Sequence, residues 1–343
     1  MEPLGFPSSL PQFQKFFPND KACAKHLEAV RWPQGFVCPA CGHQDDPWRL
    51  TRSVVVLRCP TCRKDVYLTA GTVMQDTHTP LSTWFWGAYL MTTQTPGLSS
   101  VQFQRQLGLK RNETAFTMLH KLRAGMVRRD RDKIGEMWPV EIDECYVGGA
   151  TRGEGKGVHH KSLVVGAVEV RRKQPPEDPI ELRKWLKLPA RKRIYAGRLR
   201  LQVVPDRRMD MLTEFVKENI APKATILSDG WQGYNELMSL GYKHKPLVMA
   251  GDPKNAEDHL PMIHIVISNL KTWLLGTHHG RVEPQHLQSY LNEYVFRFNR
   301  RFYPMNAFNS VLGLAAKSAS PTYEQLYSGA WEHPGSCPNI EFR

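Results

Sequence analysis

The chain has 343 residues, 41% of them hydrophobic, which is enough for two or three packed units. Its net charge of +13 is large for an enzyme of small metabolites and indicates a polyanionic partner, most commonly nucleic acid. The start of the chain lacks a signal-peptide pattern, and the most apolar run, residues 81–91, is too short to span a membrane. We therefore expect a cytoplasmic protein without a membrane partner, whose seven cysteines do not form a disulfide framework.

Two Cys-x-x-Cys pairs, with 17 residues between them, follow a predicted N-terminal arm and short helix over residues 1–30. Each pair can turn both sulfurs toward one metal ion, and this spacing is typical of a structural four-thiolate zinc site. The sequence therefore predicts a zinc ribbon over residues 31–72, which could contact DNA or protein. The expected zinc ligands are Cys38, Cys41, Cys59 and Cys62.

Residues 80–135 have the apolar spacing of helices. One predicted helix covers residues 98–107, a glycine turn follows, and a longer helix covers residues 111–126. This order, with basic side chains, favours a DNA-binding helix-turn-helix, although ordinary helical hairpins share it. The side chains expected to face DNA are Lys110, Arg111, Lys121 and Arg123.

Residues 138–310 change to a mixed strand and helix pattern, followed by a predicted tail over residues 311–343. The order is three strands, helix, strand, helix, strand and helix, which is that of the ribonuclease-H-like α/β fold. The predicted strands are residues 140–147, 162–170, 198–204, 224–227 and 247–249, and the predicted helices are 209–219, a helix that begins at 231, 257–275 and 284–300. Five glycines in residues 148–157 predict a hairpin tip.

A basic segment, residues 171–200, interrupts the predicted strands. It holds 11 Lys and Arg against 3 Asp and Glu, a net of +8 within the total of +13. We predict that it lies along DNA, with a solvated charged surface as the alternative. Its central basic residues are Arg191, Lys192 and Arg193.

Two carboxylates fall at the ends of predicted strands, Asp143 on the first and Asp229 on the fourth. Oxygen ligands of this kind suit Mg²⁺, and paired sites hold two such ions about 4 Å apart for phosphoryl transfer. Each acid has an alternative role, because Asp229 could only cap a helix and Glu144 could replace Asp143 as the ligand. A later helix adds the polar residues His264, Ser268, Asn269 and Lys271.

The chain resembles bacterial insertion-sequence transposases that combine an N-terminal zinc ribbon with an integrase-like, DDE-type catalytic domain of D-D-N-K signature. The segments that carry the resemblance are Arg31–Phe36, the four cysteines, Thr69–Thr72, Glu141–Glu144, Ser228–Tyr234, His264–His279 and Arg297–Arg301. The resemblance implies that Asp143, Asp229, Asn269 and Lys271 are catalytic. It also implies structural Zn²⁺ and catalytic Mg²⁺ or Mn²⁺. The implied partners are double-stranded DNA, as terminal inverted repeats and target, and further copies of the chain on the bacterial nucleoid.

The third active-site residue has two candidates in the sequence. Asn269 and Lys271 lie about 200° apart around a regular helix, so they do not share a face. His264 and Lys271 do share one, together with Ser268. The resemblance therefore favours Asn269, and helix geometry favours His264.

Two other classes of protein would also explain the charge and the ribbon. One is a non-enzymatic DNA-binding regulator built from the ribbon and the helix-turn-helix, which would leave Asp143 and Asp229 without a role. The other is an inactive transposase copy that folds and binds DNA. We expect an active transposase, whose end sequence and target preference the residues do not specify.

Overall fold

The computed structural model describes residues 7–128, 131–148, 161–247, 260–279, 282–316, 321–334 and 336. The chain divides into two compact units. The N-terminal unit comprises Met1–Arg129 and Arg300–Pro334, and the sheet unit comprises Asp130–Asn299 and Gly335–Arg343. Most of the predicted glycine-rich tip, residues 248–249 of the last predicted strand and residues 257–259 of the next helix lie outside the described residues. Among the described helices, none is both long and apolar enough to cross a membrane.

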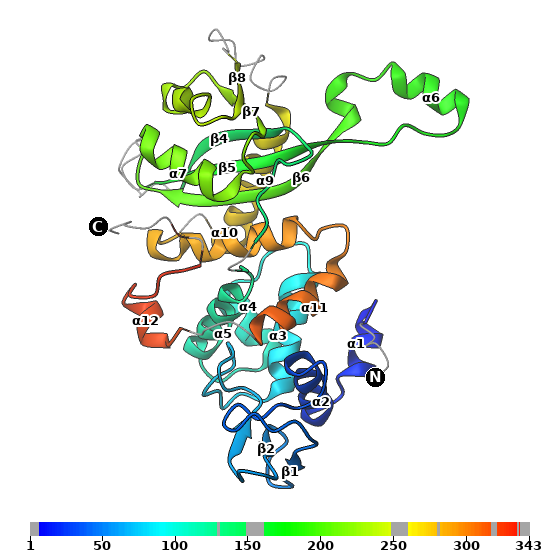
Figure 1. Cartoon of the computed structure of the whole chain (residues 1–343), viewed down its shortest axis with the longest axis vertical. Coiled ribbons are helices and arrows are strands. Elements are labelled where there is room, and N and C mark those ends of the chain that lie inside the picture. The colour runs from blue at the N-terminus through cyan, green and yellow to red at the C-terminus, as the bar shows by residue number, and fades with distance from the viewer. Residues whose placement is uncertain are drawn as a thin grey trace. The chain divides into compact units, whose positions relative to one another are not determined.

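The N-terminal unit combines a small three-stranded sheet with a group of helices (Figure 1). The strands pair antiparallel in the order β1-β2-β3, as expected for a ribbon. The strands are β1 (Trp48–Arg49), β2 (Val56–Arg58) and β3 (Asp65–Tyr67). The helices are α1 (Leu10–Phe16), α2 (Asp20–Arg31), α3 (Leu81–Thr93), α4 (Ser100–Leu107), α5 (Asn112–Ala124), α11 (Pro304–Ala315) and α12 (Tyr323–Tyr327).

The prediction of a loosely held N-terminal arm is wrong for the described residues that begin at 7. The side chain of Phe13 on α1 is fully buried, and its ring contacts Tyr89 of α3 and Phe308 of α11 at centroid distances of 4.4 and 5.5 Å. The contact between Phe13 and Phe308 explains why α11 belongs to the N-terminal unit. The sequence had divided this helix between the predicted segment 138–310 and the predicted tail 311–343. Aromatic burial of this kind stabilises the segment by roughly 2–3 kcal/mol per ring.

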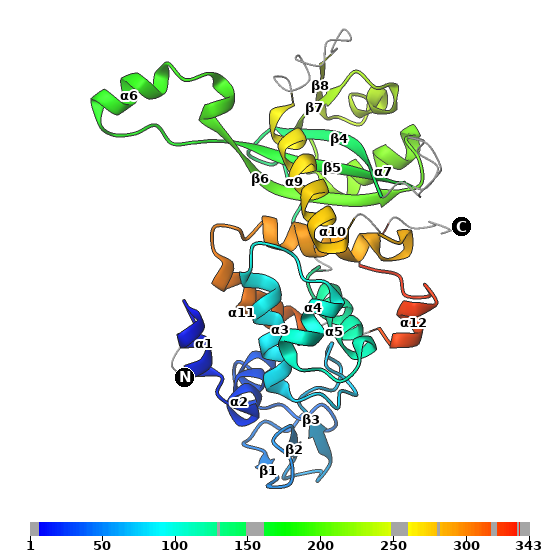
Figure 2. The same ribbon diagram turned by 180° about the vertical axis from the view of Figure 1, so that it is seen from behind.

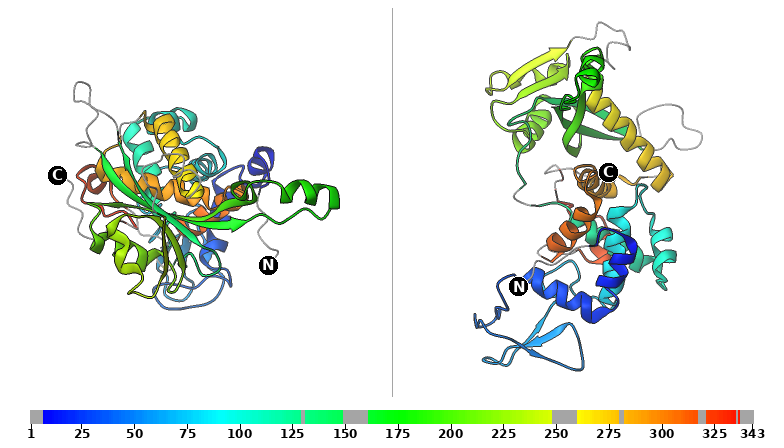
Figure 3. Two further views of the ribbon diagram at one scale, coloured as in Figure 1. Left: turned by 90° about the horizontal axis from the view of Figure 1, so that it is seen from above. Right: turned by 90° about the vertical axis from the view of Figure 1, so that its right-hand side faces the viewer.

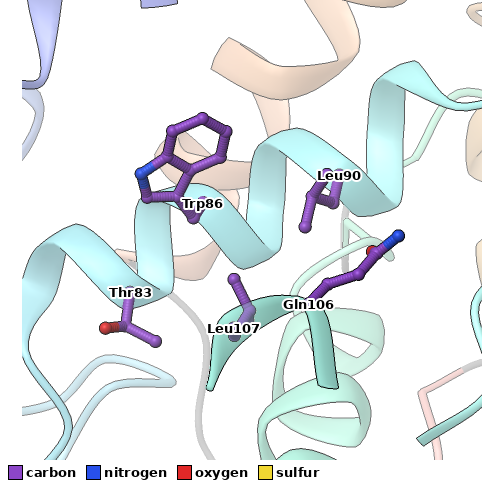
Figure 4. Close-up of a pocket in the computed structure, with 5 residues that line it drawn as sticks. All are labelled: Thr83, Trp86, Leu90, Gln106 and Leu107. Carbon is purple, nitrogen blue, oxygen red and sulfur yellow. The ribbon is translucent and has the colours of Figure 1, made fainter. Parts of the chain in front are cut away.

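The predicted helical pair is present as α4 and α5. The turn between them begins at Gly108, whose φ of 62° lies in the left-handed region that glycine adopts readily. An open cavity of about 420 Å³ lies between α3 and α4 (Figure 4). Its lining residues are Thr83, Trp86, Leu90, Gln106 and Leu107, none of which titrates or ligates a metal ion, so the cavity does not supply catalytic groups.

The sheet unit has five strands in the order β6-β5-β4-β7-β8. β4 pairs antiparallel with β5 and parallel with β7, while β6 is antiparallel to β5 and β8 is parallel to β7. The strands are β4 (Val140–Val147), β5 (Ser162–Arg172), β6 (Ile194–Val204), β7 (Thr225–Asp229) and β8 (Lys243–Leu247). The helices are α6 (Pro179–Leu186), η1 (Ala190–Arg193), α7 (Met209–Asn219), η2 (Gln232–Leu237), α9 (Pro261–His278) and α10 (Pro284–Phe298). This order confirms the predicted ribonuclease-H-like fold.

The central strand β4 separates two apolar cores because its side chains alternate between the faces of the sheet. Val140 and Ile142 pack with α7 and η2, whereas Cys145 and Val147 pack with α9 and α10. The helices accordingly cover opposite faces of the sheet, as Figures 1 and 2 show from the two sides. Glu141 and Asp143 lie four and two residues before Cys145, so their side chains point to the same face of β4. Both acids therefore lie on the face that α9 covers.

Residues 173–193 of the predicted basic segment form an arm between β5 and β6, which contains α6 and the 3₁₀ helix η1. The prediction is wrong for the two ends of the segment, residues 171–172 and 194–200, because they belong to β5 and β6. The arm stands off the sheet in Figures 1 and 2 and in the left panel of Figure 3. No residue of α6 is buried, and the Arg193 guanidinium lies 5.4 Å from the Trp185 ring centroid, which joins the end of η1 to α6. Such a projection exposes basic side chains instead of packing them on the sheet.

Candidate functional site

The four predicted zinc ligands lie on two similar turns of the ribbon. In the first turn the Cys38 N–H donates to the His43 carbonyl at 2.9 Å, and in the second the Cys59 N–H donates to the Lys64 carbonyl at 3.1 Å. Burial raises the pKa of Cys38, but backbone N–H groups, with the neighbouring thiols, outweigh it and bring the pKa to about 7. The local backbone therefore favours the thiolate form that binds a metal ion.

The sulfur positions fit a tetrahedral zinc ion. The Sγ atoms of Cys38 and Cys62 are 3.7 Å apart, as are those of Cys41 and Cys59, and all four lie within 4.8 Å of one another. Zinc–sulfur bonds of about 2.3 Å in a tetrahedron require sulfur separations of about 3.8 Å. The ribbon therefore carries a four-thiolate cluster that supports a structural zinc ion.

The two predicted catalytic acids lie at the same level on neighbouring parallel strands. Val140 pairs with Ile226 and Glu141 with Leu227 across β4 and β7, an offset of 86 residues. The same offset separates Asp143 from Asp229. Because parallel strands advance together, the register brings the two carboxylates to one edge of the sheet.

His264 on α9 reaches this edge. Its Nε2 atom lies 3.2 Å from Asp143 Oδ2, and the two side chains are 26% and 20% exposed. The other oxygen of Asp143 accepts the Glu144 backbone N–H at 2.8 Å. Asp143 therefore contacts His264, the candidate that helix geometry favoured over Asn269.

Glu141 fixes the start of α9 against β4. Its side chain is 1% exposed, and Oε2 accepts the backbone N–H groups of Met262 and Ile263, both at 2.8 Å. The N-cap residue Leu260 provides no side-chain bond, so Glu141 replaces the missing cap from another element. Burial raises the pKa of Glu141 to about 7, although both N–H bonds oppose that shift. Strand β4 thus holds the first turn of α9 through Glu141. Two residues later on the same strand, Asp143 contacts His264.

Glu144 points to the opposite face of β4 from Asp143, as strand alternation predicts. The Tyr234 hydroxyl donates to its carboxylate, and burial raises the pKa of Glu144 to about 7. The negative charges of Asp143 and Asp229 add to this shift. Glu144 is therefore occupied by a buried tyrosine, which favours Asp143 as the exposed ligand.

Asp229 combines a turn contact with an unfavourable charge environment. Its Oδ1 atom accepts the Trp231 N–H at 3.1 Å, so the helix-cap alternative is partly realised. Burial raises the pKa of Asp229 and Asp143 adds to the shift, whereas Arg207 and His264 oppose it. Two carboxylates that repel each other at a half-buried edge are suited to hold a cation. Their oxygens fit Mg²⁺ or Mn²⁺, and the imidazole of His264 suits Mn²⁺ better.

The remaining residues of the expected catalytic set lie on α9. Lys271 is exposed and follows His264 by seven residues, so the two share a face of the helix. Burial raises the pKa of Cys145 on β4, and the charge of Lys271 opposes that shift. Asn269 is also exposed, and within the described part of the chain its side chain makes no hydrogen bond. It follows His264 by five residues, which places it about 140° around the helix. Helix phase therefore separates Asn269 from the face that His264 presents to Asp143.

Of the four basic residues on the helical pair that were predicted to face DNA, one is buried and one is bonded to the backbone of another segment. Arg123 is only 2% exposed, so the prediction for it is wrong, because a phosphate cannot reach a buried guanidinium. The Lys121 ammonium donates to the Gln75 carbonyl at 3.3 Å. Lys110 and Arg111 are exposed at the turn, as are Arg191 and Lys192 on the arm.

Three residues beside the acids were missed by sequence reasoning. Glu141 could have been noticed, because it shares the strand face of Asp143. Tyr234 ends one of the segments that carry the resemblance, but its contact with Glu144 and the approach of Arg207 depend on long-range packing.

A mixed five-stranded sheet with carboxylates at the adjacent ends of β4 and β7 defines the class as a ribonuclease-H-like domain. Residues 135–299 match the model of the ISXO2-like transposase domain, and residues 18–65 match that of the transposase zinc-ribbon domain. The chain therefore belongs to the insertion-sequence transposases that join a zinc ribbon to a DDE-type domain. No curated protein and no solved structure matches the chain.

Proposed function

We propose that this transposase binds the ends of its element, cuts a DNA strand there and joins the freed end to target DNA. The observation that carries the proposal is the shared level of Asp143 and Asp229, with His264 at 3.2 Å from Asp143. Membership of the transposase family agrees with it. Double-stranded DNA also accounts for the net charge of +13 and for the exposed basic arm.

The cutting step is a hydrolysis in which water attacks phosphorus, the bond to the 3′-oxygen breaks, and the element end keeps a 3′-hydroxyl. In the joining step that hydroxyl attacks a target phosphate, and the target 3′-oxygen leaves. Bound Mg²⁺ or Mn²⁺ would stabilise the negative charge on the attacking and the leaving oxygen in each step. Asp143, Asp229 and the imidazole of His264 would hold the ions, and Lys271, which shares a helix face with His264, would contact a phosphate.

We infer that His264, rather than Asn269, is the third residue of the site. His264→Ala is expected to slow strand cleavage by about 100-fold or more, because it removes a side chain in contact with Asp143, whereas Asn269→Ala should stay within a few-fold of wild type. Cleavage of labelled element ends in Mg²⁺ and in Mn²⁺ measures both variants. DNA binding, measured alongside, should be unchanged. An active His264→Ala beside an inactive Asn269→Ala would reverse the assignment.

The arm is proposed to contact DNA phosphates. Replacing Arg191, Lys192 and Arg193 by Ala should weaken binding to any duplex and lower the slope of log affinity against log salt by about 2–3, since each lost phosphate contact removes about 0.9. The matched control, Arg191→Lys with Arg193→Lys, keeps the charge and should keep the slope. An unchanged slope in the alanine variant would show that the arm is a solvated surface.

A non-enzymatic regulator remains the second candidate function, since the ribbon and the exposed turn residues Lys110 and Arg111 would serve it equally well. It predicts DNA binding that depends on the ribbon and no cleavage in either metal ion.

Association of several copies on DNA is part of our proposal, because a reaction at two element ends requires it. Sedimentation of the protein with element-end duplex tests this association.

A further inference from the structure

A partly exposed aromatic residue contacts Asp229 through its backbone. Trp231 is 42% exposed, two residues after Asp229, and its backbone N–H donates to the Asp229 carboxylate at 3.1 Å. A tryptophan gains most from complete burial, so an exposed indole at this place needs another explanation than core packing.

The indole is held in a fixed position. Its Nε1–H donates to the Arg207 carbonyl at 3.3 Å, and the Arg207 guanidinium lies 5.3 Å from its ring centroid. Gly233 allows this placement, because a Cβ atom there would approach the indole Cδ1 and Nε1 atoms to 2.9 Å. The ring is therefore pre-organised before any ligand binds, which lowers the entropy lost on binding.

The Arg207 guanidinium has unused hydrogen-bonding capacity. It also lies 5.8 Å from the Tyr146 ring centroid, but within the described ranges it makes no hydrogen bond or ion pair. Arg207 nevertheless acts on the acids, because it opposes the raised pKa values of Asp229 and Glu144. A planar cation that has no hydrogen bond to the described residues and a fixed indole thus stand together beside Asp229.

We propose that Trp231 and Arg207 form a nucleotide subsite, in which an unpaired base next to the cleaved phosphate stacks on the indole and Arg207 binds a neighbouring phosphate. The proposal rests on the proposed function and specifies its substrate as a DNA end opened at the cleavage position. Aromatic stacking accepts any base, and arginine pairs with phosphate oxygens through its planar donors. A purely structural role, in which Trp231 only braces the turn after β7, is the competing explanation.

Photo-crosslinking tests the subsite without requiring cleavage. An element-end duplex with 5-iodouracil at the first position outside the inverted repeat is irradiated with the full-length protein, and crosslinked peptides are mapped. We expect a crosslink on the peptide that contains Trp231, reduced at least tenfold in Trp231→Ala and largely kept in Trp231→Phe. Tyr327→Ala removes another exposed aromatic side chain, on α12, and should leave the yield unchanged. An equal yield in Trp231→Ala, or a crosslink elsewhere, would overturn the proposal.

Rescue of cleavage by a mismatch adds a readout that a bracing role would not give. Trp231→Ala should cut a fully paired end roughly 10- to 100-fold more slowly than wild type, because unpairing is no longer offset by stacking. A single mismatch at that position should restore much of the rate. If the mismatch gives no recovery, Trp231 is structural. If wild type never cuts but crosslinks through Trp231, the proposed function fails and the subsite stands.

Discussion

Replacing Cys59 by Ser is expected to abolish zinc binding and unfold the ribbon. The strands there have only two or three residues, so packing alone cannot hold them, whereas structural zinc contributes on the order of 10 kcal/mol to the folding of such modules. Metal analysis should fall from one zinc ion per chain to none. Circular dichroism and proteolysis should show the loss of order between residues 31 and 72.

Cys23→Ser is the matched control for this change. Cys23 is also a buried thiol of the N-terminal unit, but it lies on α2 and outside the four-sulfur cluster. Its variant should keep one zinc ion per chain even if its stability falls. A folded Cys59→Ser protein that still retains stoichiometric zinc, or a wild-type protein purified without chelator that contains none, would contradict the zinc site.

Replacing Asp143 by Asn is expected to lower strand cleavage by roughly 1000-fold or more while DNA binding changes little. The amide keeps the shape of the side chain and can still accept the Glu144 N–H, but it removes the charge that would hold a cation beside Asp229. Single-turnover cleavage and binding titrations on the same labelled duplex separate the two effects.

Asp210→Asn is a suitable control, since Asp210 is a 60% exposed acid in the first turn of α7. It should cleave like wild type. If Asp143→Asn keeps its activity and Glu144→Gln loses it, the ligand on β4 is Glu144, and Tyr234 must release it when metal binds.

Local patterns predicted the strand that carries the site. The apolar alternation of residues 140–147 gave β4 its observed ends, and the position of Asp143 within it followed. The four cysteines were predictable because their spacing alone brings them to one metal ion. Helix phase likewise made His264 a candidate beside Asn269, and its ring lies 3.2 Å from Asp143.

Features that depend on distant parts of the chain were not predictable in this way. Phe13 looked like part of a free arm because the ring that covers it, Phe308, follows almost 300 residues later. Arg123 has the spacing of a DNA-facing residue, and only the packing of the helices buries it. Glu141 caps a helix more than 100 residues away, and no local signal marks such a contact.

The most direct measurement of the central proposal is a strand-cleavage assay with wild-type protein on a labelled duplex that carries the terminal inverted repeat and flanking DNA. Reactions with Mg²⁺, with Mn²⁺ and with chelator are compared on a sequencing gel, with target plasmid present. We predict a strand cut at the end of the repeat with a 3′-hydroxyl, a joined product with the plasmid, and neither product with chelator. Stable binding of the duplex without cleavage in either metal ion would contradict the account and would favour a DNA-binding regulator or an inactive copy.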